Sequence, residues 1–70
     1  KPTNDKLRIR ARGLVQRVSG VDEAAAQRAL EACAWEVKTA IVVLMRKMTP
    51  EEARAKLAER RGMLREVLEG

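Results

Sequence analysis

The sequence predicts an all-α fold in which five short helices form one small domain over residues 1–70. Apolar residues recur at helical spacing, and clear capping signals separate the helical segments. The apolar residues are mostly Ala, Leu and Val, with one Trp, no Phe and no Tyr. Such small side chains suit close helix–helix packing. We expect a compact three-helix bundle over residues 1–48 and an added helical pair over residues 49–70.

The first helix is expected to begin at a cap on Thr3 or Asn4 and to end at Ser19-Gly20. Gly20 can adopt the left-handed backbone conformation that such an ending needs. The apolar residues between these signals fall at i, i+4, i+7, i+8 and i+11, and therefore form one stripe: Leu7, Ala11, Leu14, Val15 and Val18.

The second and third helices are expected to form the centre of the core. Asp22 caps the second helix. Its predicted buried stripe is made of small residues: Ala26, Ala29, Leu30 and Cys33. The pattern breaks at Ala34-Trp35 and restarts in the most hydrophobic segment, with a stripe of Val37, Ala40, Ile41, Leu44, Met45 and Met48. We expect the two methionines to complete the core and Trp35 to be partly buried, although an exposed interface role for Trp35 is the alternative.

The fourth helix has the sharpest start signal in the chain, Thr49-Pro50-Glu51-Glu52. Thr49 is the cap, Pro50 takes the first helical position, and Glu52 completes a capping box. This helix buries Ala53 and Leu57 and stops at Gly62. A last short helix is expected to bury Leu64, Val67 and Leu68.

The positive charge is concentrated in the first helix. Six basic residues and one acidic residue lie in the first twenty positions, whereas nine bases balance nine acids from Val21 onward. Helical spacing places Lys6, Arg10 and Arg17 on one face and Arg8 and Arg12 on another. A basic helix of this kind calls for an anionic partner or a neighbouring acidic surface.

Nucleic acid is the less favoured partner for these bases, because no aromatic residue is interleaved with them for base stacking. A solvated face, or docking onto an acidic upstream domain, explains them better. Loss of binding to DNA or RNA with added salt would revive the nucleic-acid hypothesis.

The residue types for catalysis are scarce. With no His and one Cys, zinc sites and His-based triads cannot be assembled, so no catalytic residue, metal or cofactor is assigned. Glu51 and Glu52 are explained by the helix start, and Cys33 by a small buried apolar position. The lone cysteine gives no internal disulfide, and we expect a cytoplasmic protein without a membrane span or signal peptide. The opening at Lys1 suggests a piece of a longer protein.

The three-helix pattern resembles the ubiquitin-associated-like superfamily. The resemblance lies in Ser19-Gly20-Val21 and in the run of Ala26, Ala29-Leu30, Val37, Ala40-Ile41 and Leu44. Ubiquitin-binding members carry a Met-Gly-Phe or Met-Gly-Tyr first loop, and this chain lacks that aromatic. A ubiquitin-recognition role is therefore weakly indicated.

A resemblance along nearly the whole chain is to the C-terminal domain of bacterial N-acetylmuramic acid 6-phosphate etherases. Its motifs are Pro2-Thr3-Asn4-x-Lys6-Leu7, Arg10-Ala11, Gly20, Ala26 with Leu30, Lys38-x-Ala40-Ile41-Val42, Glu52-Ala53 with Leu57, and Leu64-Arg65. The family often has Gly, Asp or Asn in the turn where this chain has Ala34-Trp35. The resemblance implies a parent enzyme, a carbon–oxygen lyase with an upstream sugar-isomerase-type domain that carries the catalytic glutamates. Such enzymes cleave the lactyl ether of their sugar phosphate in cell-wall recycling, and a homodimeric parent is compatible with the family.

The resemblance also implies a role near the substrate. The related glucokinase regulatory protein uses its helical C-terminal part as a lid over a sugar phosphate. By analogy, Asn4 and Lys6 are the candidate contacts to the substrate phosphate, because a helix start with a nearby ammonium group attracts anions. The alternative is that Lys6 is solvated and Asn4 only caps the helix. A stand-alone ubiquitin-associated-like binding module for protein or RNA is the second hypothesis, and it would hold its partner unaided.

Overall fold

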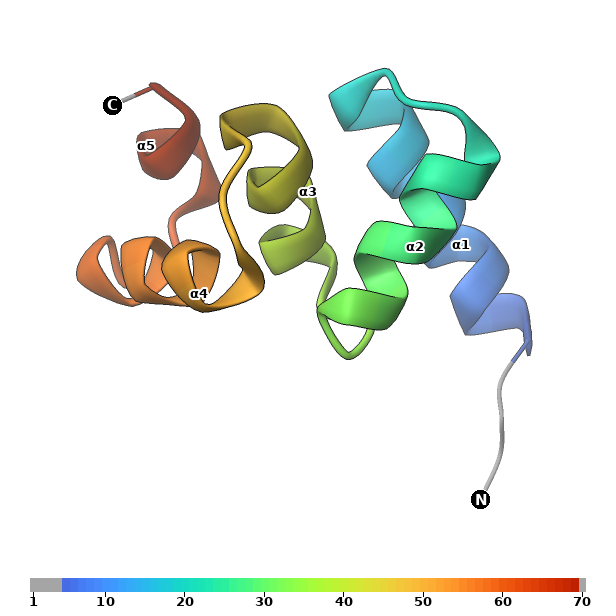
Figure 1. The fold of residues 1–70 in the computed structure, drawn as a ribbon, viewed down its shortest axis with the longest axis horizontal. Helices are drawn as coiled ribbons and strands as arrows, with labels where there is room; N and C mark the ends of the chain where they lie inside the picture. Colours follow the sequence, from blue (N-terminus) through green and yellow to red (C-terminus); the bar gives the residue numbers. More distant parts are fainter. Residues whose placement is uncertain (1–4, 70) are drawn as a thin grey trace.

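The computed structural model describes residues 5–69 and contains five α-helices joined by tight turns (Figure 1). In chain order these are α1 (Asp5–Ser19), α2 (Glu23–Ala32), α3 (Val37–Arg46), α4 (Pro50–Glu59) and α5 (Leu64–Glu69). The predicted all-α class and the five predicted helices are confirmed. The assignment to the ubiquitin-associated-like superfamily stays a prediction.

Helix α3 lies in the middle of the molecule, with α1 and α2 packed on one side and α4 and α5 on the other (Figure 1). The core accordingly has two clusters. The first joins α1, α2 and α3 through Val15, Ala26, Ala29, Leu30, Cys33, Ala40 and Ile41. The second joins α3, α4 and α5 through Val42, Ala53, Leu57 and Val67. Because α3 supplies residues to both clusters, it couples the two halves of the fold.

The predicted starts of α2 and α4 are confirmed by their hydrogen bonds, whereas the cap predicted at Thr3 or Asn4 lies outside the described residues. The Asp22 carboxylate accepts the backbone N–H of Ala25 at 2.8 Å. The Thr49 hydroxyl accepts the N–H of Glu52 at 3.1 Å, and the Glu52 carboxylate accepts the N–H of Thr49 at 3.0 Å. Each pair satisfies backbone donors that the first turn of a helix leaves without a partner.

Two turns share one backbone geometry. After α2, Ala34 and Trp35 both have positive φ, 53° and 62°, and the Trp35 N–H donates to the Leu30 carbonyl at 2.7 Å. After α4, Arg61 and Gly62 have φ of 54° and 76°, and the Gly62 N–H donates to the Leu57 carbonyl at 2.6 Å. This six-to-one hydrogen bond is the Schellman ending of a helix.

The core predictions hold for α2 and α4 and fail at one end of α3. The predicted stripe of α2 is buried, as are Ala53 and Leu57. Trp35 is half-buried against the first cluster, which confirms its partial burial. Met45, however, is 45% exposed, so the prediction that it completes the core is wrong. The buried residues of α3 are Thr39, Ala40, Ile41 and Val42 in the middle of the helix, whereas Met45 lies in its last turn. Met48 is half-buried on the second cluster.

None of the helices among residues 5–69 has both the length and the apolar character needed to cross a bilayer.

Candidate functional site

Helix α1 carries more exposed large apolar side chains than any other described helix. Val15 is fully buried and Ala11 is half-buried, and both pack into the first cluster. Leu7, Leu14 and Val18 are 57%, 43% and 41% exposed. The five residues predicted as one buried stripe are therefore divided, because α2 and α3 cover only one edge of it. Leu7, Leu14 and Val18 stand at i, i+7 and i+11, so they form an exposed row along the helix.

Two basic residues of α1 contact side chains of other elements. The Arg8 guanidinium lies 4.8 Å from the centre of the Trp35 ring, a cation–π contact that joins α1 to the turn before α3. The Arg12 guanidinium donates to the Gln27 side-chain carbonyl at 2.9 Å and lies 3.4 Å from the Glu23 carboxylate. Arg8 and Arg12 thus serve the α1–α2–α3 bundle.

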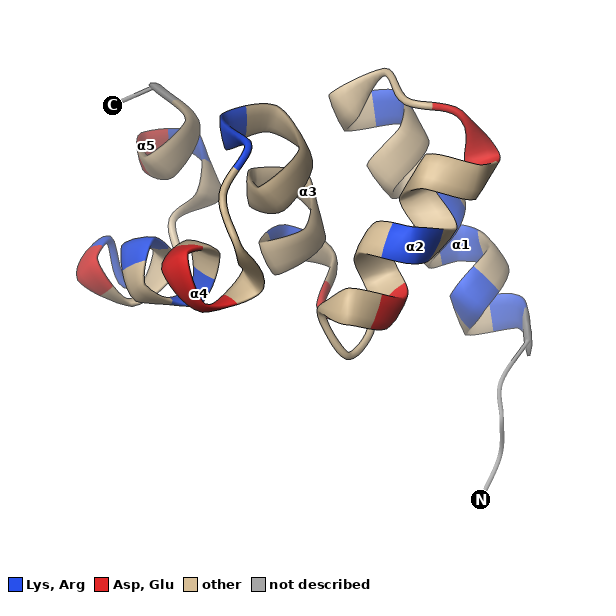
Figure 2. Cartoon of the chain, in the orientation of Figure 1, with Lys and Arg blue, Asp and Glu red and all other residues tan. Residues whose placement is uncertain are grey.

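The other basic residues of α1 face solvent. Lys6, Arg10 and Arg17 are exposed, and no ion pair joins them to a carboxylate in the described part of the chain. They stand at i, i+4 and i+11, on the face that borders the apolar row. Figure 2 shows basic residues spaced along α1, whereas acidic and basic residues alternate on α4. The exposed α1 face is defined here by Lys6, Leu7, Arg10, Leu14, Arg17 and Val18.

The two residues predicted to contact a substrate phosphate are placed only in part. Lys6 lies in the first turn of α1 and is exposed. Asn4 lies outside the described residues. Their contact with a phosphate stays a prediction, and Lys6 is one member of the larger exposed α1 face.

Potentially reactive side chains elsewhere are held in structural roles. Cys33 is fully buried at the end of α2, and burial, the largest cause, raises the pKa of its thiol, which disfavours the reactive thiolate. Glu52 belongs to the capping box. Among residues that the structure describes, no group of three His, Cys, Asp or Glu side chains is placed to hold a metal ion.

One polar cluster was not predicted from the sequence. The Glu36 carboxylate accepts hydrogen bonds from the Thr39 hydroxyl at 2.9 Å and from Arg54 Nε at 3.1 Å. The Arg54 hydrogen bond, followed by that of Thr39, lowers the pKa of Glu36 below its ordinary value. Because Arg54 is 18 positions away on α4, no local pattern indicated this contact. It ties the start of α3 to α4 and lies away from the exposed α1 face.

The exposed α1 face is a candidate interaction surface. A row of exposed apolar side chains bordered by cations fits a protein surface that offers apolar contacts and carboxylates.

Comparison with known proteins gives this surface a context. The chain is 46% identical over 68 residues to the N-acetylmuramic acid 6-phosphate etherase of Deinococcus radiodurans, covering 97% of this chain and 22% of that protein. It is 40% identical over 70 residues to the etherase of Erwinia tasmaniensis, covering 100% of this chain and 23% of the relative. The etherase of an Exiguobacterium strain is 38% identical over 68 residues, with 97% and 23% covered.

No family model and no solved structure matches the chain significantly. The chain spans between a fifth and a quarter of the length of the curated relatives that it matches, 22% to 23%. These matches confirm the resemblance that the motifs indicated. The chain is thus related, over nearly its whole length, to a segment of the N-acetylmuramic acid 6-phosphate etherases.

Proposed function

We propose that this chain is the non-catalytic C-terminal domain of an N-acetylmuramic acid 6-phosphate etherase. It packs against an upstream sugar-isomerase-type domain of the same polypeptide, which carries the catalytic groups and binds the sugar phosphate. The observation that carries this proposal is the coverage: 97% of this chain aligns with 22% of a larger etherase. A cytoplasmic, homodimeric parent belongs to the same proposal.

The exposed α1 face supports docking onto the rest of the enzyme. Three of the four exposed large aliphatic side chains of α1 lie in one row, Leu7, Leu14 and Val18, and burying one such side chain fully contributes about 1.5–3 kcal/mol. Arg10 and Arg17 border the row and would face acidic side chains on the docked surface, where desolvation strengthens charge pairs. The proposed partner that covers the exposed α1 face is the rest of the etherase chain.

The proposed lid role rests on the analogy with the glucokinase regulatory protein, and the place of Lys6 supports it. Lys6 lies in the first turn of α1, where backbone N–H groups and the helix dipole favour an anion. Together with Asn4, it would approach the substrate phosphate from the side of the upstream domain. The domain would then contribute to substrate enclosure through Lys6 and to stability through Leu7, Leu14 and Val18.

A chimera tests both roles. This chain would replace the aligned segment of the Deinococcus radiodurans etherase, and cleavage of N-acetylmuramic acid 6-phosphate would be compared with that of the same enzyme lacking the segment. We expect the chimera to be active and the shortened enzyme to lose most of its activity. A chimera as inactive as the shortened enzyme, although folded, would contradict the proposal.

The lid role has its own variant. Lys6→Ala in the chimera should raise KM for the sugar phosphate, whereas Lys47→Ala, an exposed lysine at the end of α3, should leave KM unchanged. Equal KM values for both variants would remove Lys6 from the substrate site while leaving the structural role intact.

The alternative is a stand-alone binding module for protein or RNA. The exposed α1 face is also the surface such a module would use. In that case the separate 70-residue chain binds a partner tightly, whereas the docked domain has little affinity of its own. Salt-sensitive binding of the chain to RNA would favour the alternative.

A further inference from the structure

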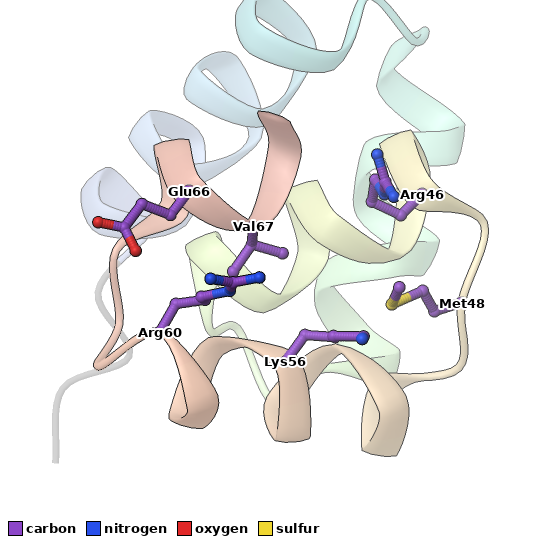
Figure 3. A pocket seen from close by; sticks show the side chains of 6 residues that line it. All are labelled: Arg46, Met48, Lys56, Arg60, Glu66 and Val67. Carbon is purple, nitrogen blue, oxygen red and sulfur yellow. The ribbon is translucent and has the colours of Figure 1, made fainter. Parts of the chain in front are cut away.

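A second basic region lies on the opposite side of α3 from α1. A small hollow of about 30 Å³, open to solvent, is formed where the end of α3, the second half of α4 and α5 meet (Figure 3). Its lining residues are Arg46, Met48, Lys56, Arg60, Glu66 and Val67. Three of these side chains are cationic and one is a carboxylate. The exposed α1 face contributes nothing to this hollow.

The cations of the hollow are largely available to a ligand. Arg46 Nη1 donates to the Leu68 carbonyl at 3.3 Å, which fixes Arg46 toward α5 and leaves its remaining N–H groups unused by that contact. Lys56 Nζ lies 3.9 Å from the Glu59 carboxylate, and both side chains are more than half exposed, so this ion pair is weak. Among the described residues, no ion pair involves Arg60. In Figure 3 the Glu66 carboxylate points away from the three cationic groups.

Helix ends alone do not explain this arrangement. Arg46 and Lys56 lie in the last turns of α3 and α4, where a cation stabilises the helix dipole. Stabilisation of the helix dipole explains why each helix has a cation in its last turn. It does not require side chains from two helices to line one hollow, with buried Val67 and half-buried Met48 beside them.

We propose that this hollow binds a phosphate group, either as inorganic phosphate or as the terminal group of a small phosphomonoester. Arginine offers planar, paired N–H donors that match phosphate oxygens, and lysine adds a point charge. At about 30 Å³ the hollow is too small to enclose an extended ligand. This site is separate from the substrate contact proposed for Lys6 and does not depend on the etherase assignment.

The test is an NMR titration of the ¹⁵N-labelled 70-residue chain with sodium phosphate, at ionic strength held constant with sodium chloride. We expect saturable shifts of the backbone amides of Arg46, Lys56, Arg60 and Val67. A parallel titration with glucose 6-phosphate distinguishes the two sources. Tighter binding of the ester indicates a phosphomonoester site, and equal or weaker binding indicates a site for free phosphate.

Matched variants locate the binding. Arg60→Gln should raise the dissociation constant about fivefold, as expected for one charge pair at a partly exposed site, and adding Lys56→Gln should weaken binding further. Arg28→Gln, which removes an exposed arginine of α2 outside the hollow, should change it less than twofold. Unchanged amide spectra outside the hollow establish that the variants are folded.

Three results would overturn the proposal. The first is an absence of saturable shifts with both ligands. The second is shifts of similar size along α1 and in the hollow, which would indicate general attraction to a basic protein. The third is an equal loss of binding in Arg60→Gln and Arg28→Gln.

Discussion

At the residue scale, the turn between α2 and α3 concentrates backbone strain. Ala34 and Trp35 both have left-handed φ, a conformation that costs non-glycine residues about 1–2 kcal/mol each. At Trp35 this strain is offset by contacts of the ring, which packs on the first cluster and lies under Arg8. Ala34 is exposed and has no such packing.

Ala34→Gly should therefore stabilise the chain. Relief of the left-handed strain exceeds the extra unfolded-state entropy of glycine, for a net gain of about 0.5–1 kcal/mol. Thermal unfolding followed by circular dichroism would show a higher midpoint. The control is Ala24→Gly at an exposed position inside α2, which should lower stability by about 1 kcal/mol. A lower midpoint for Ala34→Gly would mean that the turn is not strained at this position.

Glu36 makes stability depend on acidity. Hydrogen bonds from Arg54 and Thr39 lower its pKa in the folded chain, so the folded state favours the ionised carboxylate. Its contribution is fully present above the ordinary carboxyl pKa of 4.5 and is lost as the pH falls through the lowered folded value. Glu36→Gln should flatten this part of the curve of unfolding midpoint against pH. Glu51→Gln, at an exposed position of α4, is the control, and an identical flattening in both variants would contradict the role of Glu36.

At the element scale, α1 offers a matched pair of valines. Val15 is fully buried and Val18 is 41% exposed, three residues along the same helix. Val15→Ala should lower the free energy of unfolding by about 2 kcal/mol, because it removes buried methyl groups and leaves a cavity. Val18→Ala should cost less than about 0.5 kcal/mol in the separate chain. Chemical denaturation measures both, and equal losses would mean that the row is buried in solution.

The sequence predicted those elements whose signals are local. The Asp22 cap, the Thr49–Glu52 capping box and the end of α1 at Gly20 each depend on residues within one turn of each other, and all are confirmed. The exposure of Leu14 and Met45 was not predictable in this way. Helical spacing shows which residues share a face, but burial depends on how far the neighbouring helices extend over that face.

The basic residues of the exposed α1 face were predictable from the sequence, whereas its apolar residues were not. Charge imbalance and spacing placed Lys6, Arg10 and Arg17 on one face from the sequence alone. That Arg8 would pair with Trp35 depended on the folded turn, 27 positions further along the chain. That Leu7 would stay exposed depended on the packing of α1 against α2 and α3.

At the scale of the whole molecule, the central position of α3 bears on the predicted division into residues 1–48 and 49–70. Val42 is fully buried by the second cluster, so a fragment 1–48 would expose it. If the division is correct, the fragment with Val42→Thr should keep a cooperative thermal transition at a lower midpoint than the full chain. A fragment without helical circular dichroism would show that residues 1–70 fold as a single unit.

The proposed docking of α1 would be a property of the complete enzyme, and hydrogen exchange measures it directly. In the chimera, the rest of the etherase should cover the exposed α1 face and slow hydrogen exchange of the backbone amides of residues 6–18 relative to the separate chain. Burial of even one leucine, about 1.5 kcal/mol, corresponds to roughly tenfold slower opening of the helix. The backbone amide of Val67 lies in the second cluster, away from α1, and is the control. Its exchange rate should be the same in the chimera and in the separate chain.

Substitutions connect this protection to the apolar row. Leu14→Glu places a carboxylate in the docked surface, where its desolvation is costly, and should return α1 exchange in the chimera to the rate of the separate chain. Met63→Glu is the control, because Met63 is 52% exposed in the turn before α5, whereas Leu14 is 43% exposed on α1. Fast α1 exchange in the unsubstituted chimera would show that the row faces solvent in the enzyme. The basic residues beside it would then be a solvated surface rather than a docking edge.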